Sequence, residues 1–111
     1  MNIGFCIGSS PGELKTKFAL DLAKECKSLN YVVDVFLFDD GIYNALQNKS
    51  VKCVTNVLMD LVDNNDNVNV CVNMAKYRGV NESNTAEYVD ISSLISFSGL
   101  INNSNVVVTT K

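Results

Sequence analysis

Four cysteines, at positions 6, 26, 53 and 71, are the residues of this 111-residue chain with the widest chemical range. All four lie inside apolar runs rather than loops, which favours reduced thiols over a disulfide framework. No two of them form a close pair and the chain has no histidine, so the usual zinc-binding patterns are absent. Mechanisms that need an imidazole base are excluded as well. The remaining chemistry is that of a thiol, with no metal or cofactor expected.

A glycine-rich segment, Gly8–Gly12 (GSSPG), follows the first apolar run. Glycines allow close backbone approach and a helix N-terminus attracts anions, so one interpretation is a phosphate cradle. The segment matches neither the dinucleotide-binding pattern nor the Walker pattern. A plain strand-to-helix turn is therefore favoured, and small-anion binding is kept as the alternative.

Paired carboxylates occur at Asp39–Asp40, and Asp63 and Asp66 stand in a later polar loop. Such carboxylates hold magnesium in some proteins, but a solvated turn is the favoured interpretation here. The loop at 63–67 (DNNDN) lacks the glycine and the glutamate that a calcium-binding loop needs at its sixth and twelfth positions. We therefore expect no metal site.

Apolar patterning indicates which elements position these residues. Short apolar runs predict strands at 2–7, 31–38, 68–72 and 105–109. Apolar residues recurring every three or four positions predict helices at 13–29 and 51–62, with shorter helical stretches at 42–46, at 74–79 before a glycine, and within 87–100. The alternation predicts an α/β fold: a three-layer, doubly wound, mainly parallel sheet of four to five strands flanked by helices. Residues 1–111 are expected to form a single domain.

Composition narrows the function classes. The chain is 47% hydrophobic and 19% charged, which suffices for a core. Its net charge is −3 and its nine basic residues are scattered, so direct nucleic-acid binding is not expected. No apolar stretch approaches a membrane span and no N-terminal signal is evident. A cytoplasmic location without membrane association is the resulting expectation.

Cys71 differs from the other cysteines because it falls at the carboxyl end of a predicted central strand, just before a helix. Free backbone N–H groups and the helix dipole favour the thiolate there. Lys76 and Arg78 would add positive potential if they folded back towards the thiol. The alternative is that Cys71 packs as a small hydrophobe, the interpretation favoured for the mid-strand Cys6 and for the cysteines in the two long predicted helices.

Several blocks of the sequence resemble the DsrE/TusD-type sulfur-relay family. The resemblance runs almost end to end, through the turn at 8–12 and the segments 17–23 (KFALDLA), 38–45 (FDDGIYNA), 69–72 (NVCV) with 78–80 (RGV), and 97–100 (FSGL). The segments around Gly41-Ile42-Tyr43-Asn44 and around Cys71 are the more specific ones.

This resemblance implies that Cys71 is the catalytic residue, accepting sulfane sulfur as a persulfide and passing it to a partner. It also implies a persulfide donor or acceptor protein as partner, and either a homo-oligomer (trimer or hexamer) or a hetero-oligomer of related subunits. The candidate lining residues of the site are Ser9, Ser10, Tyr43, Asn44 and Arg78. The chain departs from the family pattern at Asn73-Met74, where small residues are usual, and at Tyr77, where a second arginine is common.

Two other functions stay open, because members of one fold differ in activity. The first is a non-catalytic structural or small-anion-binding oligomeric subunit whose thiol is incidental. The second is a redox sensor, with Cys6 as the resolving cysteine for Cys71. That sensor requires the first and third strands to be neighbours in the sheet.

Overall fold

A computed structural model describes residues 1–46, 67–85 and 89–111 of the chain. The elements are β1 (Asn2–Ile7), α1 (Leu14–Ser28), β2 (Val32–Leu37), the 3₁₀ helix η1 (Asp39–Ala45), β3 (Asn67–Cys71), α3 (Val72–Tyr77), β4 (Val89–Ser92), α4 (Leu94–Asn103) and β5 (Val106–Thr110). The helix predicted at 51–62, together with Cys53, Asp63 and Asp66, lies outside the described residues. None of the described helices is long and apolar enough to cross a membrane.

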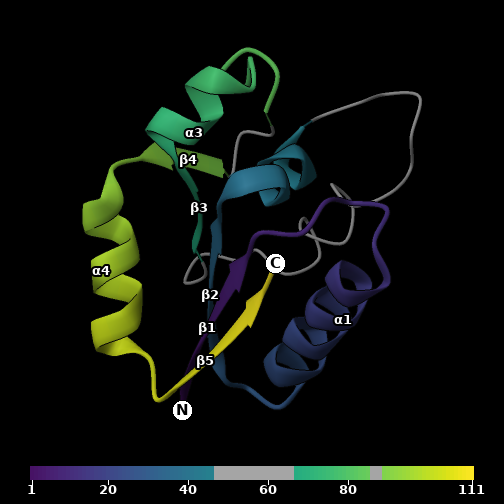
Figure 1. Cartoon of the computed structure of the whole chain (residues 1–111). Coiled ribbons are helices and arrows are strands. Elements are labelled where there is room, and N and C mark those ends of the chain that lie inside the picture. The colour runs from purple at the N-terminus through teal and green to yellow at the C-terminus, as the bar shows by residue number, and fades with distance from the viewer. Residues whose placement is uncertain (47–66, 86–88) are drawn as a thin grey trace.

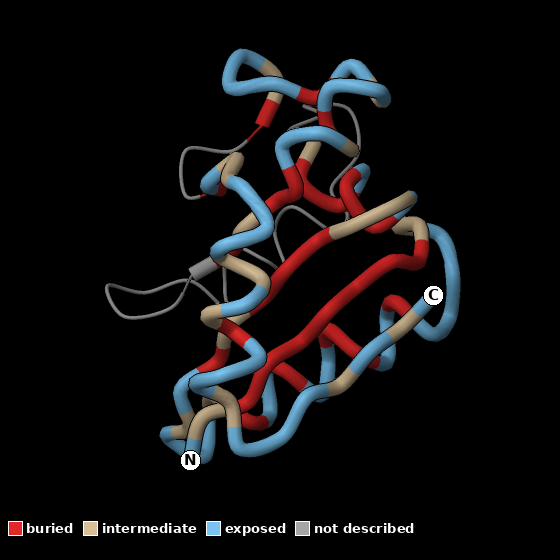
Figure 2. The backbone as a smooth tube through the Cα atoms, turned by 60° about the vertical axis from the view of Figure 1, so that its left-hand side comes forward, coloured by how far each residue is buried: buried red, intermediate tan, exposed pale blue. Residues whose placement is uncertain are grey.

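Five strands form one parallel sheet in the order β4-β3-β2-β1-β5. Figure 1 shows α1 and α4 on opposite sides of this sheet, and the central strands lie between them as the most buried part of the chain (Figure 2). The predicted doubly wound α/β fold is confirmed. The long helix and the first two strands agree with their predicted positions to within one residue at each end.

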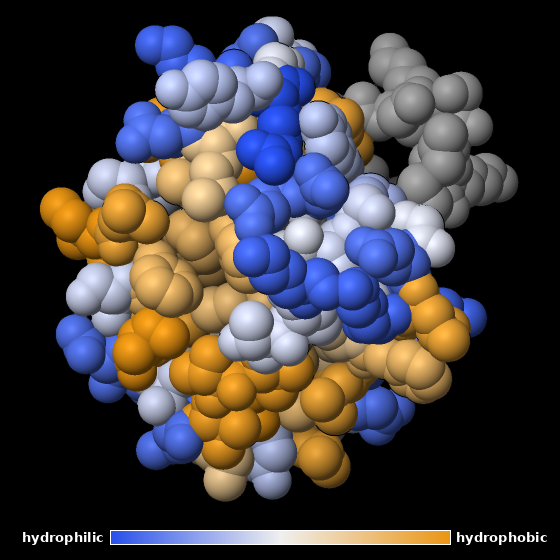
Figure 3. Space-filling view, viewed as in Figure 1, coloured by the Kyte–Doolittle hydropathy of each residue, from blue (hydrophilic) through white to orange (hydrophobic). Residues whose placement is uncertain are grey.

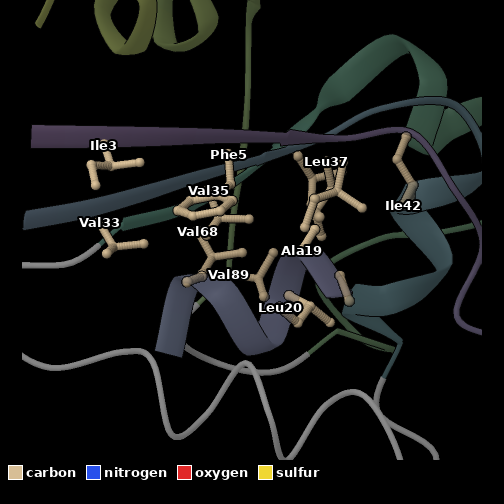
Figure 4. Close-up of a cluster of buried hydrophobic side chains, with 14 of the residues drawn as sticks. Ile3, Phe5, Ala19, Leu20, Val33, Val35, Leu37, Ile42, Val68 and Val89 are labelled. Atoms are coloured by element: carbon tan, nitrogen blue, oxygen red, sulfur yellow. The ribbon is translucent and has the colours of Figure 1, made fainter. Parts of the chain in front are cut away.

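The side of the sheet covered by α1, here named the α1 face, is built from aliphatic and aromatic side chains. Strand residues alternate between the two faces of a sheet, and the odd-numbered residues of β1 and β2 point to this one. Figure 4 shows several of these side chains between the strands and α1. The strand members of this core are Ile3, Phe5, Ile7, Val33, Val35, Leu37, Val68, Val70 and Val89.

The opposite side, named the α4 face, has a different composition. The alternation and the strand register place on it Gly4, Cys6, Asp34, Phe36, Asn69, Cys71, Asp90 and Ser92. Its buried apolar cluster is small and consists of Cys6, Phe36, Cys71 and Leu100, with Phe38, Met74 and Phe97 packed against it. One sheet therefore has an aliphatic face and a face of polar, small and sulfur-containing residues.

One or two helical stretches are predicted within 87–100; helix α4 begins at Leu94, whereas residues Val89–Ser92 form strand β4, which is not predicted. This strand has only four residues and pairs with β3. So short a segment carries almost no periodicity of its own, and its conformation depends on a long-range partner. The turn after α3 is as predicted: Gly79 has a φ of 68°, a left-handed conformation that favours glycine.

Hydroxyl groups connect the turn after β1 to α1 and to the last strand. Ser9 Oγ lies within hydrogen-bond distance of Thr16 Oγ1 on α1 and 2.7 Å from Thr110 Oγ1 on β5. Thr16 in turn donates a hydrogen bond to the Ser10 carbonyl at 2.7 Å. This chain of hydroxyls fixes the exit of β1 beside the C-terminal strand.

Candidate functional site around Cys71

Cys71 is the last residue of β3 and the N-cap residue of α3. Its strand-end position is as predicted, but the residue is buried, with 4% of its surface exposed. Phe38, Met74 and Phe97 pack against the cluster that contains it. The expected open route from Cys71 to solvent is therefore absent. The reason is that Met74 from α3 and Phe97 from α4 converge on this strand end from separate parts of the chain.

The groups that were expected to stabilise the Cys71 thiolate make other contacts or are exposed. The Cys71 side chain makes no capping hydrogen bond to α3. Arg78 forms an ion pair with Asp40, with 3.4 Å between Nη2 and Oδ1, and its Nη1 donates to the Met74 carbonyl at 3.4 Å. Lys76 is exposed on α3. Arg78 thus joins α3 to η1 at the rim of the site rather than acting on the thiol.

The position of Met74 is fixed by the start of η1. The Asp39 N–H donates to Met74 Sδ at 3.2 Å, and Asp39 has a φ of 46°. At Gly41 a Cβ atom would lie 1.9 Å from the Ile7 carbonyl oxygen, so only glycine lets η1 lie this close to the end of β1. This tight packing holds Met74 against the buried cluster that contains Cys71, which periodicity along the chain alone does not reveal.

The other predicted lining residues lie in different places. Asn44 is buried, and its Nδ2 donates to the carbonyls of Ser9 (3.1 Å) and Gly41 (2.8 Å). This contact joins Ser9 and Asn44, while the Ser9 side chain is bonded towards α1, on the other side of the sheet from Cys71. Tyr43 is 37% exposed on η1. Apart from Arg78, which contacts Met74, none of the five has a described hydrogen bond to the cover of Cys71.

The turn at 8–12 binds an anionic group that belongs to the chain itself. The Glu13 carboxylate accepts hydrogen bonds from the Ser10 N–H (2.7 Å) and from Ser10 Oγ (3.1 Å). The backbone hydrogen bond from Ser10 lowers the pKa of Glu13 below its ordinary value, with further lowering by the Ser10 hydroxyl and by Lys15. This carboxylate takes the donors that an external phosphate would use, which favours the plain strand-to-helix turn.

The paired carboxylates after β2 form ion pairs with basic side chains. Asp40 pairs with Arg78, and Asp39 Oδ2 lies 4.0 Å from Lys111 Nζ. Within residues 1–46, 67–85 and 89–111, no group of three Cys, Asp or Glu side chains is placed to hold a metal ion.

Two further cysteines are buried in the described part of the chain. Burial raises the pKa of the Cys6 thiol; burial also raises that of Cys26, with a further contribution from the Glu25 charge. The redox-sensor hypothesis requires β1 and β3 to be neighbours in the sheet. That prediction is wrong, because β2 lies between them. Two strand spacings amount to about 9.6 Å, beyond the roughly 7 Å between Cα atoms that a disulfide allows.

The fold and the strand-end cysteine define this molecule as a doubly wound α/β protein with a thiol at the ligand-binding edge of its sheet. The family model described as "DsrE/DsrF-like family" matches residues 1–110. The chain therefore belongs to the DsrE/DsrF-like family, which is associated with sulfur relay in general.

Solved structures with the same fold include three that cover 98% of this chain. The YchN protein of E. coli matches with a TM-score of 0.83 at 19% identity over 97% of its own chain. MTH1491 from Methanobacterium thermoautotrophicum (TM-score 0.70, 14% identity, 98% of its chain) and BT1422 from Bacteroides thetaiotaomicron (0.69, 12%, 94%) are both described as proteins of unknown function. No curated protein matches the sequence. These likenesses establish the fold.

Proposed function

We propose that this protein carries sulfur as a persulfide on Cys71. The observation that carries the proposal is the position of Cys71 at the carboxyl end of β3, the edge at which open parallel sheets bind their ligands. Cys6 lies within β1 and Cys26 within α1, so neither ends a strand at this edge. Membership of the DsrE/DsrF-like family supports the same assignment.

The chemistry is transfer of a sulfane sulfur between thiols and needs no cofactor. The Cys71 thiolate attacks the terminal sulfur of a donor persulfide, R–S–SH. A new S–S bond forms at Cys71, the S–S bond of the donor persulfide breaks, and R–S⁻ leaves with the electron pair. The proton remains on the transferred sulfur, and the same exchange in reverse passes it to an acceptor thiol. The donor and the acceptor are partner thiols that reach this edge of the sheet.

Transfer requires movement of the surrounding side chains, because Cys71 is 4% exposed and Met74 and Phe97 pack against its cluster. A donor thiol must approach in line with the S–S bond that breaks. Phe97 on α4 is only partly buried, so we expect its displacement to cost less packing than displacement of Met74. The Met74 side chain is the better anchored of the two through its contact with Asp39.

The test is incubation with polysulfide or with a persulfidated donor protein, followed by mass spectrometry of the intact protein and of its cysteine-containing peptides. We expect one added sulfur on the Cys71 peptide, removable by a reductant. Cys6→Ser and Cys26→Ser are the matched controls and are expected to keep the label. If Cys71→Ser acquires sulfur as readily as the parent chain, the proposal is wrong.

We also propose self-association, as a homo-oligomer such as a trimer or hexamer, or assembly with related subunits. The support is a set of exposed apolar side chains near the C-terminus, consisting of Leu94, Ile95, Ile101, Val106 and Val107. In Figure 3 hydrophobic side chains gather on the part of the surface where α4 lies. Light scattering is expected to give a mass above that of the monomer, and Ile95→Asp is expected to reduce it. A monomer at working concentration would contradict this part of the proposal.

A further inference from the structure

Three polar contacts join the start of η1 to α3, the helix that follows Cys71. The Asp39 N–H donates to Met74 Sδ at 3.2 Å. Arg78 donates twice, from Nη2 to Asp40 Oδ1 and from Nη1 to the Met74 carbonyl, each at 3.4 Å. Because Asp39 and Asp40 are neighbours in the chain, these contacts form a closed ring of four residues. We name this ring of Asp39, Asp40, Met74 and Arg78 the η1–α3 contact.

The η1–α3 contact lies next to the thiol both in the chain and in space. Cys71 is the N-cap residue of α3, and Met74, three residues later, is on the same side of the helix. Met74 also packs against the buried cluster of Cys6, Phe36, Cys71 and Leu100. Because Cys71 is 4% exposed, a movement of α3 away from η1 would take Met74 off this cluster and open a path to the thiol.

The two sides of α3 are held by interactions of different strength. Ala75 and Val80 belong to the buried core of the α1 face, and the Val80 N–H donates to the Ala75 carbonyl at 2.9 Å. In the η1–α3 contact, by comparison, the Asp40 side chain is 64% exposed and that of Arg78 is 23% exposed. Ion pairs of this exposure are weak and are screened by salt. The side of α3 that faces η1 is therefore the one that is released more easily.

The backbone at Asp39 is adapted to this contact. Asp39 has a φ of 46°, a left-handed conformation that is uncommon outside glycine and that aspartate tolerates better than most residues. Such conformations occur preferentially at functional and switch sites. Here the conformation belongs to the residue whose N–H donates to Met74 Sδ, so the strained position is also the one that holds Met74.

We propose that the η1–α3 contact regulates access to the sulfur-carrying thiol, with Asp40 and Arg78 as its positioning residues. Separation of the Asp40 carboxylate from the Arg78 guanidinium releases Met74 and makes Cys71 accessible to a partner thiol. This inference rests on the proposed function, since the regulated thiol is the one assigned to sulfur transfer. Asp40 and Arg78 act through Met74 and set how often the site opens.

The experiment is timed alkylation of the full chain with iodoacetamide, a neutral reagent, followed by peptide mass spectrometry of each cysteine. Asp40→Asn and Arg78→Gln are each expected to raise the Cys71 rate about two- to fivefold, as loss of an exposed ion pair allows, and to leave the Cys6 rate unchanged. Asp40→Glu keeps the charge and is expected to keep the parent rate. Asp21→Asn, an equal change of charge on the exposed side of α1, is the matched control.

The two main variants also separate access from a direct electrostatic effect on the thiol. Asp40→Asn removes a negative charge and Arg78→Gln a positive one, so an effect on the Cys71 thiolate would change the two rates in opposite directions. Opposite changes, an unchanged Cys71 rate in Asp40→Asn, or an equal rise at Cys6 would each overturn the proposal.

Salt and the double variant test whether the ion pair itself is responsible. Raising sodium chloride from low concentration to about 1 M screens the pair and is expected to increase the Cys71 rate of the parent but not of Asp40→Asn. The double variant is expected to react no faster than Arg78→Gln, because both changes remove the same contact. A salt response that persists in Asp40→Asn, or rates that multiply in the double variant, would overturn the proposal. If Arg78→Gln does not fold, Asp40→Asn and the salt series still decide it.

The proposals for access and for sulfur transfer fail separately, because alkylation needs no sulfur donor. If Cys71 takes up no sulfur while the variants alter its alkylation as expected, the sulfur-transfer proposal is wrong and the η1–α3 contact remains a control of thiol access. If Cys71 takes up sulfur from polysulfide equally fast in the parent and in Asp40→Asn, the regulatory proposal is wrong and sulfur transfer stands.

Discussion

The two faces of the sheet differ in the side chains that they carry and in how tightly these are packed. The α1 face is aliphatic and tightly filled, with Phe5, Ile7 and Leu37 completely buried. The α4 face contains two carboxylates, a carboxamide and two cysteines, and its helix buries Leu100 but leaves Leu94 and Ile95 exposed. Because strand residues alternate between faces, one set of five strands serves both purposes. The comparison indicates that stability is concentrated on one face and chemistry on the other.

The largest expected effect concerns the α1 face. Phe5→Ala removes a completely buried ring and is expected to lower the free energy of unfolding by about 3–5 kcal/mol, because it combines lost burial with a cavity. Urea denaturation monitored by circular dichroism measures this. Phe18→Ala is the matched control, since Phe18 is 66% exposed on α1. A loss as small as that of the control would mean that the α1 face does not dominate stability.

Reciprocal substitutions at adjacent residues of β3 test the difference in polarity. Val70→Asn places an amide in the fully buried α1 face and is expected to cost about 1–3 kcal/mol. Asn69→Val changes the half-buried α4 face and is expected to stay within about 1 kcal/mol of the parent, since valine favours strands. Thermal and urea unfolding measure both variants. Similar losses at the two sites would remove the proposed distinction between the faces.

The cover of Cys71 is tested by thiol alkylation in the native protein. Phe97→Ala is expected to increase the alkylation rate of Cys71 by roughly fivefold, equivalent to about 1 kcal/mol of lost cover. Peptide mass spectrometry after timed labelling measures the rate for each cysteine. Phe18→Ala is again the control and should not change it. An unchanged Cys71 rate in Phe97→Ala would show that another residue controls access.

Cys6 provides an internal reference in the same labelling experiment. Burial raises the pKa of Cys6, so its thiolate fraction at a given pH is below that of an ordinary cysteine. The pH midpoint of its labelling is therefore expected to be higher than that of a free cysteine. Phe97→Ala should leave the pH midpoint of Cys6 unchanged. A midpoint at or below that of a free cysteine would contradict the burial of this side chain.

The smallest effect is expected at the turn before α1. The folded-state pKa of Glu13 is lowered, so its contribution to stability is present above its unfolded-state pKa and is lost as pH falls through the folded-state value. Glu13→Gln should therefore slightly reduce the melting temperature at neutral pH and flatten its decrease in mild acid. Melting curves between neutral and acidic pH test this, with the exposed Glu25→Gln as control. An identical acid dependence in the parent and Glu13→Gln would contradict it.

Local patterning was sufficient to predict most of the fold and the position of the thiol. The strand at 2–7 and the helix before Asn30 have strong periodicity and distinct ends, and they appear where predicted. The order of the strands was not predictable in the same way, since β2 rather than β3 pairs with β1. Pairing depends on contacts between distant segments, which local patterns do not encode.

The site was predicted only in part for a related reason. Cys71 is at the strand end, but its cover comes from Met74 and Phe97, which lie 3 and 26 residues further along the chain. The short spacing to Met74 is a signal that can be recognised afterwards, as one helical turn beyond the cysteine. Helix α4 turns Phe97 and Leu100 towards the sheet and leaves Leu94 and Ile95 exposed. The local pattern does not indicate which of these apolar residues meet the sheet.

The hydroxyl contact between Ser9 and Thr110 joins residues 101 positions apart, and β5 pairs along β1 from Ile3 with Val106 to Ile7 with Thr110. During synthesis, the edge of β1 that pairs with β5 therefore waits for its partner until the residues of β5 have left the ribosome. An open strand edge is a template for pairing with other chains. The residues of β5 thus decide when this edge of the nascent sheet is no longer available for pairing with other chains.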